Sequence, residues 1–164
     1  MTHVPPTPLP PTPLLPTLAD GLDRSLMPGS VEVDIDGVHA EVDVVEVDRL
    51  GVSVRGVRVR EATARTRGGG DVVGHARRLP EALGVLGEKV VPVEVDPTLG
   101  GAVLRSKPRR QEYFEVRSDG REVSVEKLRR GPEGRARVPF TLTREQLGRL
   151  VDGVGEVLKG SGTD

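Results

Sequence analysis

Arginine side chains offer the most chemistry in this sequence, and they are concentrated in two segments. Residues 55–78 carry seven arginines against two acidic residues, Glu61 and Asp71. Residues 105–137 carry eleven basic side chains against six acidic ones. Guanidinium groups bind phosphate through paired hydrogen bonds and offer flat planes on which nucleobases stack. Two basic segments of this kind indicate a surface that contacts the phosphates of a nucleic acid.

The first predicted hairpin is acidic instead. Residues 31–48 contain seven carboxylates and no Lys or Arg, although the whole chain has 24 basic and 25 acidic residues and a formal net charge of −1. Basic residues on strands also discourage edge-to-edge pairing of sheets, and Glu122 and Glu126 could neutralise Arg135 and Arg137 across neighbouring strands. The acidic hairpin could equally meet the basic face of a second copy. Charge alone therefore leaves nucleic-acid binding and homo-oligomerisation open.

The sequence offers few residues for a catalytic, nucleotide-binding or metal-binding site. The chain has no cysteine, which excludes disulfides, thiolate metal sites and Cys nucleophiles. Gly68–Gly70 precede no Lys of a phosphate-binding loop, and no serine stands in a G-x-S-x-G turn. His39, Glu41 and Asp43 could be grouped as a metal cluster, but period-two alternation puts all three on one solvent face, which favours a solvated polar surface. We therefore predict a protein that is not an enzyme and has no metal or cofactor.

Short strands are the elements that must position the arginines. Val31, Val33 and Ile35 alternate with acidic residues, and Asp36-Gly37 is typical of a two-residue hairpin turn. The same reasoning predicts further strands over 38–43, 51–66, 71–79, 91–96, 102–105, 113–117, 121–127 and 137–142, and helices over 80–87 and 143–158. The last helix has a capping box, Thr143 with Gln146, and a buried stripe. The residues of that stripe are Leu147, Leu150, Val151, Val154 and Leu158.

The order of these elements repeats with a period near 62–64 residues. Val31-Glu32-Val33-Asp34 returns as Val93-Glu94-Val95-Asp96, and each unit reads as four strands followed by a helix. A lone unit of about 60 residues buries little core. We therefore expect an α+β fold in which two tandem ββββα repeats, 30–88 and 89–160, pack into a single domain with antiparallel curved sheets and one helix per repeat.

The N-terminal segment has a different composition. Residues 1–17 hold seven of the 14 prolines, which predicts a disordered, polyproline-II-like tail. Such a tail is either a semi-rigid tether or a ligand for an aromatic groove of a protein partner. No apolar run reaches the roughly 18 residues that a membrane helix needs, and the N-terminus lacks the basic start of a signal peptide. We expect no membrane association and a cytoplasmic location.

The second unit carries a resemblance to a known family. It contains Val103-Leu104-Arg105-Ser106-Lys107, then Tyr113-Phe114-Glu115-Val116-Arg117, Gly120 and Val123-Ser124-Val125-Glu126-Lys127, followed by the closing helix. This run is similar to the PUR repeat, a ββββα unit of the purine-rich element binding family, and the bacterial members have a similar run. The resemblance covers 102–159, and 30–88 follow it in outline. It implies two intertwined repeats and binding of single-stranded or purine-rich DNA or RNA.

The residues that would bind follow from the resemblance and from the basic turns. The resemblance implies Arg105, Lys107, Arg109, Arg110, Tyr113, Arg117 and Lys127, with Tyr113 as the one stacking ring. Phe114 and Val116 have the opposite parity to Tyr113 and Arg117 along the strand, which places them in the core. The basic residues beside the predicted turns are Arg65, Arg67, Arg129, Arg130, Arg135 and Arg137. The hypothesis is a small non-enzymatic protein that holds single-stranded DNA or RNA. The alternative is a protein-interaction or assembly module of the same fold, which uses the acidic hairpin and the Pro-rich tail.

Overall fold

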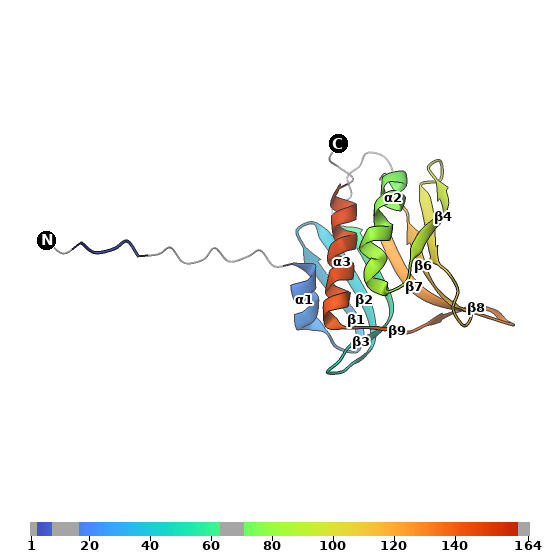
Figure 1. Cartoon of the computed structure of the whole chain (residues 1–164), viewed down its shortest axis with the longest axis horizontal. Helices are drawn as coiled ribbons and strands as arrows, with labels where there is room; N and C mark the ends of the chain where they lie inside the picture. Colours follow the sequence, from blue (N-terminus) through green and yellow to red (C-terminus); the bar gives the residue numbers. More distant parts are fainter. Residues whose placement is uncertain (1–2, 8–16, 63–70, 161–164) are drawn as a thin grey trace.

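A computed structural model describes residues 3–7, 17–62 and 71–160 of the chain. Within these residues it has three α-helices, one 3₁₀-helix and nine strands (Figure 1). In chain order they are α1 (Leu18–Ser25), β1 (Gly29–Ile35), β2 (Val38–Val47), β3 (Val52–Glu61), α2 (Val72–Ala82), η1 (Leu83–Leu86), β4 (Val90–Asp96), β5 (Gly101–Ser106), β6 (Glu112–Ser118), β7 (Glu122–Gly131), β8 (Gly134–Val138), β9 (Phe140–Leu142) and α3 (Arg144–Lys159).

The strands form one open antiparallel sheet. Its order is β1-β2-β3-β7-β6-β5-β4, with β8 paired to β7 and β9 paired to β3. The central pair, β3 with β7, joins strands from the two halves of the chain, and Val57 lies opposite Val125 there. The predicted α+β class is confirmed, in the form of a single continuous sheet.

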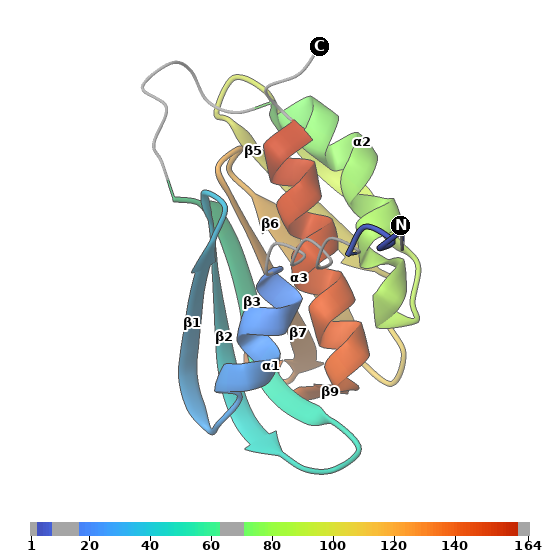
Figure 2. The same ribbon diagram turned by 90° about the vertical axis from the view of Figure 1, so that its left-hand side faces the viewer.

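The helices lie on one face of this sheet, with α3 between α1 and α2 (Figure 2). Helix α2 follows β3 in the chain but packs against β4, β5 and β6, whereas α3 follows β9 and packs against β3. Helix α2 therefore covers strands that follow it in the chain, whereas α3 covers a strand from the first half of the chain. None of the helices in the described residues lies on the opposite face of the sheet, here called the outer face (Figure 2).

Local sequence signals explain the elements that were predicted correctly. Asp36 and Gly37 both have positive φ, 55° and 77°, as a tight hairpin turn requires, and the turn sets Ile35 opposite Val38. At the other end, Thr143 and Gln146 form the expected capping box of α3. All the residues predicted for the buried stripe of α3 are buried, and they form part of one core with the inner face of the sheet.

The predicted strand over 71–79 is wrong, because this segment begins helix α2. Asp71 is the N-cap, and its carboxylate accepts a hydrogen bond from the Gly74 amide. Val72, His75, Ala76 and Leu79 recur at helical spacing and are all buried. His75 thus belongs to a helix, and the predicted helix start at Pro80 falls inside α2, near its end. β-branched Val72 and Val73 suggested a strand, but the packing of the stripe decides the outcome.

The tandem-repeat prediction is not confirmed. Among the described residues, three strands precede α2, whereas six lie between α2 and α3, and a further helix, α1, precedes β1. Helix α1 was not predicted, although Thr17 and Asp20 form a capping box and Leu18 and Leu22 are buried one turn apart. Helix α1 packs against α3 and β1. The N-terminal part of the core therefore begins before residue 30.

Parts of the predicted tail and of one turn cannot be compared with the structure. Residues 3–7 are exposed and belong to no helix or strand, while 8–16 and Gly68–Gly70 lie outside the described residues. Among the residues that are described, no helix combines the length and apolar character that a bilayer crossing demands.

Candidate functional site

The arginines of β5 and β6 converge on one carboxylate of the outer face. Oε1 of Glu115 lies 2.9 Å from Nε of Arg105, and its Oε2 lies 3.2 Å from Nε of Arg117. Arg135, from β8, approaches the same carboxylate at 3.7 Å. Glu115 is only 6% exposed, whereas the three arginines remain partly or largely in solvent. The group has a net positive charge, but its central position is already occupied by a carboxylate.

Nearer the middle of the sheet, basic and acidic residues also alternate across strands. Nε of Arg58 lies 2.8 Å from Glu122, and Nε of Arg137 lies 3.7 Å from Glu126. Arg137 also donates a hydrogen bond to the backbone carbonyl of Arg55. The predicted neutralisation of Arg137 by Glu126 is therefore present, while Arg135 and Glu122 take other partners. The centre of the outer face is a network of ion pairs rather than a basic platform.

A denser group of cations lies at one end of the sheet. The loop between β5 and β6 meets β7 here, because the Arg130 amide donates to the Gln111 carbonyl at 2.9 Å. We call this surface the basic end. It consists of Lys107, Arg109, Arg110, Arg129 and Arg130, all of them exposed. Within the described part of the chain, Lys107, Arg109 and Arg110 form no ion pair with a side chain, so their charge is available to an external anion.

Glu112 is a carboxylate that contacts this group. It accepts a hydrogen bond from Arg129 and lies 3.6 Å from Nζ of Lys127. The hydrogen bond from Arg129 holds the pKa of Glu112 below its ordinary value. Lys127 itself lies over the ring of Phe114, 5.2 Å from its centre. Lys127 and Arg129 are therefore partly engaged inside the protein.

The prediction that Tyr113 is an exposed stacking ring is wrong. Tyr113 is 1% exposed, and the guanidinium of Arg130 lies 5.4 Å from the centre of its ring. Phe114 and Val116 are buried as expected. Tyr113 does point to the face opposite Phe114, but it is covered there. The aromatic residues of the chain, which are Tyr113, Phe114 and Phe140, are thus all withdrawn from the surface.

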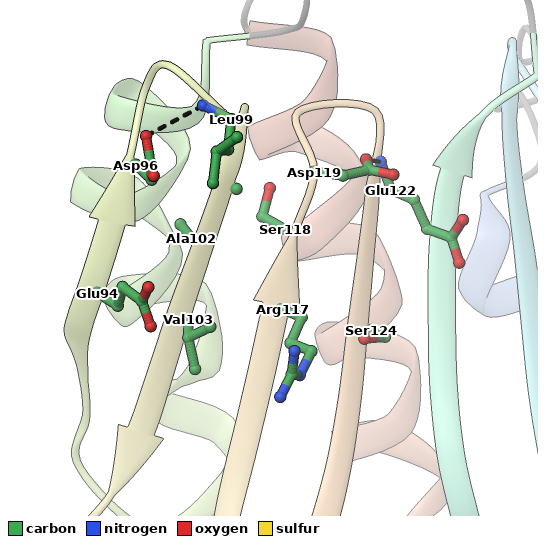
Figure 3. Close-up of a pocket in the computed structure, with 11 residues that line it drawn as sticks. Glu94, Asp96, Leu99, Ala102, Val103, Arg117, Ser118, Asp119, Glu122 and Ser124 are labelled. Atoms are coloured by element: carbon green, nitrogen blue, oxygen red, sulfur yellow. Dashed lines mark hydrogen bonds between the residues drawn. The ribbon is translucent and has the colours of Figure 1, made fainter.

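A hollow of about 460 Å³ lies on the outer face near the β4–β5 turn (Figure 3). Val103, Arg117 and Ser124 line it from the neighbouring strands β5, β6 and β7 (Figure 3). Its other polar residues are mainly acidic, namely Glu94, Asp96, Asp119 and Glu122. With Arg117 already bound to Glu115, the hollow does not extend the basic end toward β4.

The prediction that His39 lies on a solvated face is wrong. This histidine is 7% exposed, and its carboxylate neighbours are Asp34 and Glu32 of β1 rather than Asp43. Sequence reasoning missed Glu32. The signal was available, because a two-residue turn at Asp36-Gly37 sets Glu32 opposite Glu41 and Asp34 opposite His39.

The structure brings most of the predicted binding residues to the outer face and the basic end. Arg65 and Arg67 lie outside the described residues. Glu115, around which three of the predicted arginines gather, was missed because its partners come from three different strands. Comparison of the chain with protein-family models, with curated proteins and with solved structures gives no match.

Proposed function

We propose that this protein is a non-enzymatic binding protein that holds single-stranded nucleic acid by its phosphates at the basic end. The observation that carries this proposal is the junction of the 107–111 loop with β7, fixed by the hydrogen bond from Arg130 to Gln111. It gathers five cations from two separate segments, and Glu112 pairs with one of them, Arg129. A cluster of this kind attracts polyanions in a way that depends strongly on salt.

The mode of binding follows from what the surface contains. Because the aromatic rings are buried, base stacking would depend on guanidinium planes such as those of Arg109 and Arg110. Contacts of this type read phosphate and shape rather than base sequence. We therefore expect weak sequence preference, and the resemblance of 102–159 to a PUR repeat supports the same class of ligand.

The experiment is a titration of a fluorescently labelled single-stranded oligonucleotide at about 50 mM and about 200 mM salt. The protein should bind at the lower concentration and lose most of its affinity at the higher one. The double variant Arg109→Glu, Arg110→Glu should lose roughly tenfold or more at low salt. Arg149→Glu is the matched control, since Arg149 is exposed on α3 and pairs with Glu145. Absence of binding at low salt, or equal losses in both variants, would refute the proposal.

Charge segregation also favours a second candidate, self-assembly. The acidic residues of β1 and β2 lie at one edge of the sheet, away from the basic end, so the two surfaces of different copies are complementary. Such a head-to-tail contact is concentration-dependent and weakens with salt. Sedimentation velocity over a range of protein concentrations separates the two candidates. Assembly that Arg109→Glu, Arg110→Glu abolishes, without oligonucleotide binding by the unmodified protein, would favour this alternative.

A further inference from the structure

His39 is a buried histidine on a strand that otherwise shows polar groups to the outer face. Its side chain is 9% exposed, and it points toward the edge strand β1. The Nδ1 atom lies 2.7 Å from Oδ1 of Asp34. The Nε2 atom is buried and makes no hydrogen bond with any described residue. A buried ring nitrogen without a hydrogen bond is costly unless something else satisfies it.

Asp34 determines which nitrogen remains available. When the neutral imidazole carries its proton on Nδ1, that N–H donates to the Asp34 carboxylate and the lone pair resides on Nε2. A carboxylate that orients a histidine in this way is the usual second partner of metal-binding histidines, and it also makes the ring a stronger ligand. The arrangement therefore prepares Nε2 as a ligand.

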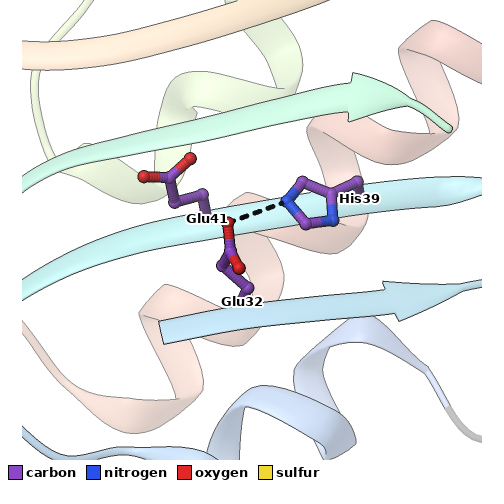
Figure 4. A group of neighbouring side chains, drawn as sticks. All are labelled: Glu32, His39 and Glu41. Atoms are coloured by element: carbon purple, nitrogen blue, oxygen red, sulfur yellow. Dashed lines mark ion pairs between the residues drawn. The ribbon is translucent and has the colours of Figure 1, made fainter. Parts of the chain in front are cut away.

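Two carboxylates lie on the side to which Nε2 points (Figure 4). Oε1 of Glu32 is 3.6 Å from Nε2, and Glu41 stands directly opposite Glu32 across the β1–β2 pair. One ligand atom from each of the three side chains falls within 4.8 Å of the others. Ligand atoms about 2.0–2.2 Å from a shared zinc ion are a little over 3 Å apart in tetrahedral geometry. Small rotations of two glutamate side chains would close the site.

We propose that Glu32, His39 and Glu41 form a binding site for a divalent transition-metal ion of the zinc type. One imidazole and two carboxylates are a ligand set that suits such ions better than magnesium or calcium, which prefer oxygen alone. The side chain of Glu32 is 60% exposed, so solvent reaches the site and water can complete the coordination. The ion would join edge strand β1 to β2.

The surrounding charges bear on this site as well. Arg60 lies opposite His39 on β3 and Arg58 lies opposite Glu41. Arg58 is already paired with Glu122. Ser30 places its hydroxyl 3.4 Å from Oε1 of Glu41, which leaves the other oxygen of Glu41 for an ion. Without a metal, the contacts with Asp34 and Glu32 would be the whole role of His39, and the test separates these two cases.

The test is titration of the metal-free full-length protein with Zn²⁺ by calorimetry and with Co²⁺ by visible absorption. We expect one saturable equivalent, with a Co²⁺ spectrum that reports nitrogen and oxygen ligands. Asp34→Asn should weaken binding by roughly 10–100-fold, and Glu32→Gln, which removes a ligand, by at least about tenfold. His39→Asn should abolish it. Because Glu32 is exposed, Glu32→Gln is expected to fold normally, which circular dichroism can confirm.

Two controls address nonspecific binding. Asp43→Asn removes a carboxylate from the same strand that is not part of the site, and His3→Ala removes the histidine of the N-terminal segment. Both should retain the affinity of the unmodified protein. The proposal is overturned if no saturable binding occurs, because His39 then does no more than contact Asp34 and Glu32 within the sheet. It is equally overturned if Glu32→Gln and Asp43→Asn bind Zn²⁺ alike. Neither result depends on whether the basic end binds nucleic acid.

Discussion

The Nε atom of Arg105 lies 2.9 Å from Oε1 of Glu115, a carboxylate that is 6% exposed although it points away from the helices. Arg117 and Arg135 share that carboxylate. A single buried negative charge thus organises three cations from β5, β6 and β8. Hydrogen bonds to charged groups are stronger than those between neutral groups. When such a bond is lost, the partner that remains is left buried with poor access to water.

Glu115→Gln should therefore have two measurable effects. It should lower the free energy of unfolding by about 1–3 kcal/mol, because the amide replaces a charge that three arginines share. It should also strengthen oligonucleotide binding if the basic end acts as proposed, because the field of the outer face becomes more positive. Urea denaturation and the oligonucleotide titration measure these effects. Glu133→Gln, in the exposed β8 hairpin, should alter stability by less than about 0.5 kcal/mol.

The contact of α1 with α3 gives a second prediction. A Cβ atom at Gly148 would come within 2.8 Å of the Ala19 Cβ, so Gly148→Ala should push the helices apart. We expect a loss of about 1–3 kcal/mol from overpacking, although alanine favours a helix by about 1 kcal/mol over glycine. Gly84→Ala is the control, because a Cβ at Gly84 meets no heavy atom within 4 Å. This view would be contradicted if thermal unfolding showed Gly148→Ala to be more stable than Gly84→Ala.

The N-cap of α3 gives a third prediction. The Thr143 hydroxyl accepts a hydrogen bond from the Gln146 amide at 3.0 Å, and the Gln146 side chain accepts one from the Thr143 amide at 2.9 Å. Thr143→Ala should lower stability by about 1 kcal/mol, whereas Thr143→Ser should keep the cap and most of the stability. Denaturant unfolding followed by circular dichroism compares the two. Equal losses in both variants would mean that the methyl group, not the cap, is what matters.

His75 predicts a dependence of stability on pH. Burial, followed by the charge of Arg78, lowers the pKa of His75 below its ordinary value, while Asp71 and Asp119 act in the opposite direction. The unfolded chain therefore binds a proton near its ordinary pKa that the folded chain binds only at lower pH. The free energy of unfolding should fall as the pH drops below about 6.5, by at most about 1.4 kcal/mol per pH unit.

Unfolding by urea at about pH 7.5 and about pH 5.5 measures this difference. His75→Leu should reduce it, since a group that cannot titrate adds no slope. The comparison of the two proteins separates His75 from the other titrating groups, which both chains share. If the two proteins lose the same stability between these pH values, the folded pKa of His75 is not lowered.

Elements with local signals could be predicted from the sequence. The Asp36-Gly37 hairpin and the Thr143 cap depend on residues only a few positions apart, and both were predicted correctly. The strand predicted over 71–79 failed for the opposite reason. Its β-branched start resembles a strand, and the weaker helix signals, the Asp71 N-cap and the spacing of His75 and Leu79, decide the outcome only because that stripe is buried in the fold.

The candidate site was predictable in composition but not in geometry. The basic residues were identified, yet alternation says only which face a residue occupies, not what covers that face. Tyr113 shows this, because it points away from Phe114 as expected and is nevertheless buried. Glu115 required the register of β5, β6, β7 and β8 together, and such long-range pairing is not encoded in any short segment.

The placement of α3 over strands from the first half of the chain affects how the protein is made. Strands β1 to β3 leave the ribosome long before Phe140–Lys159, which supplies both β9 and the helix that covers β3. The part of their apolar side that α3 covers stays open during this interval, so completion of the fold waits until residues 140–159 have been made. A chain that stops before Phe140 should therefore aggregate rather than yield a smaller stable protein.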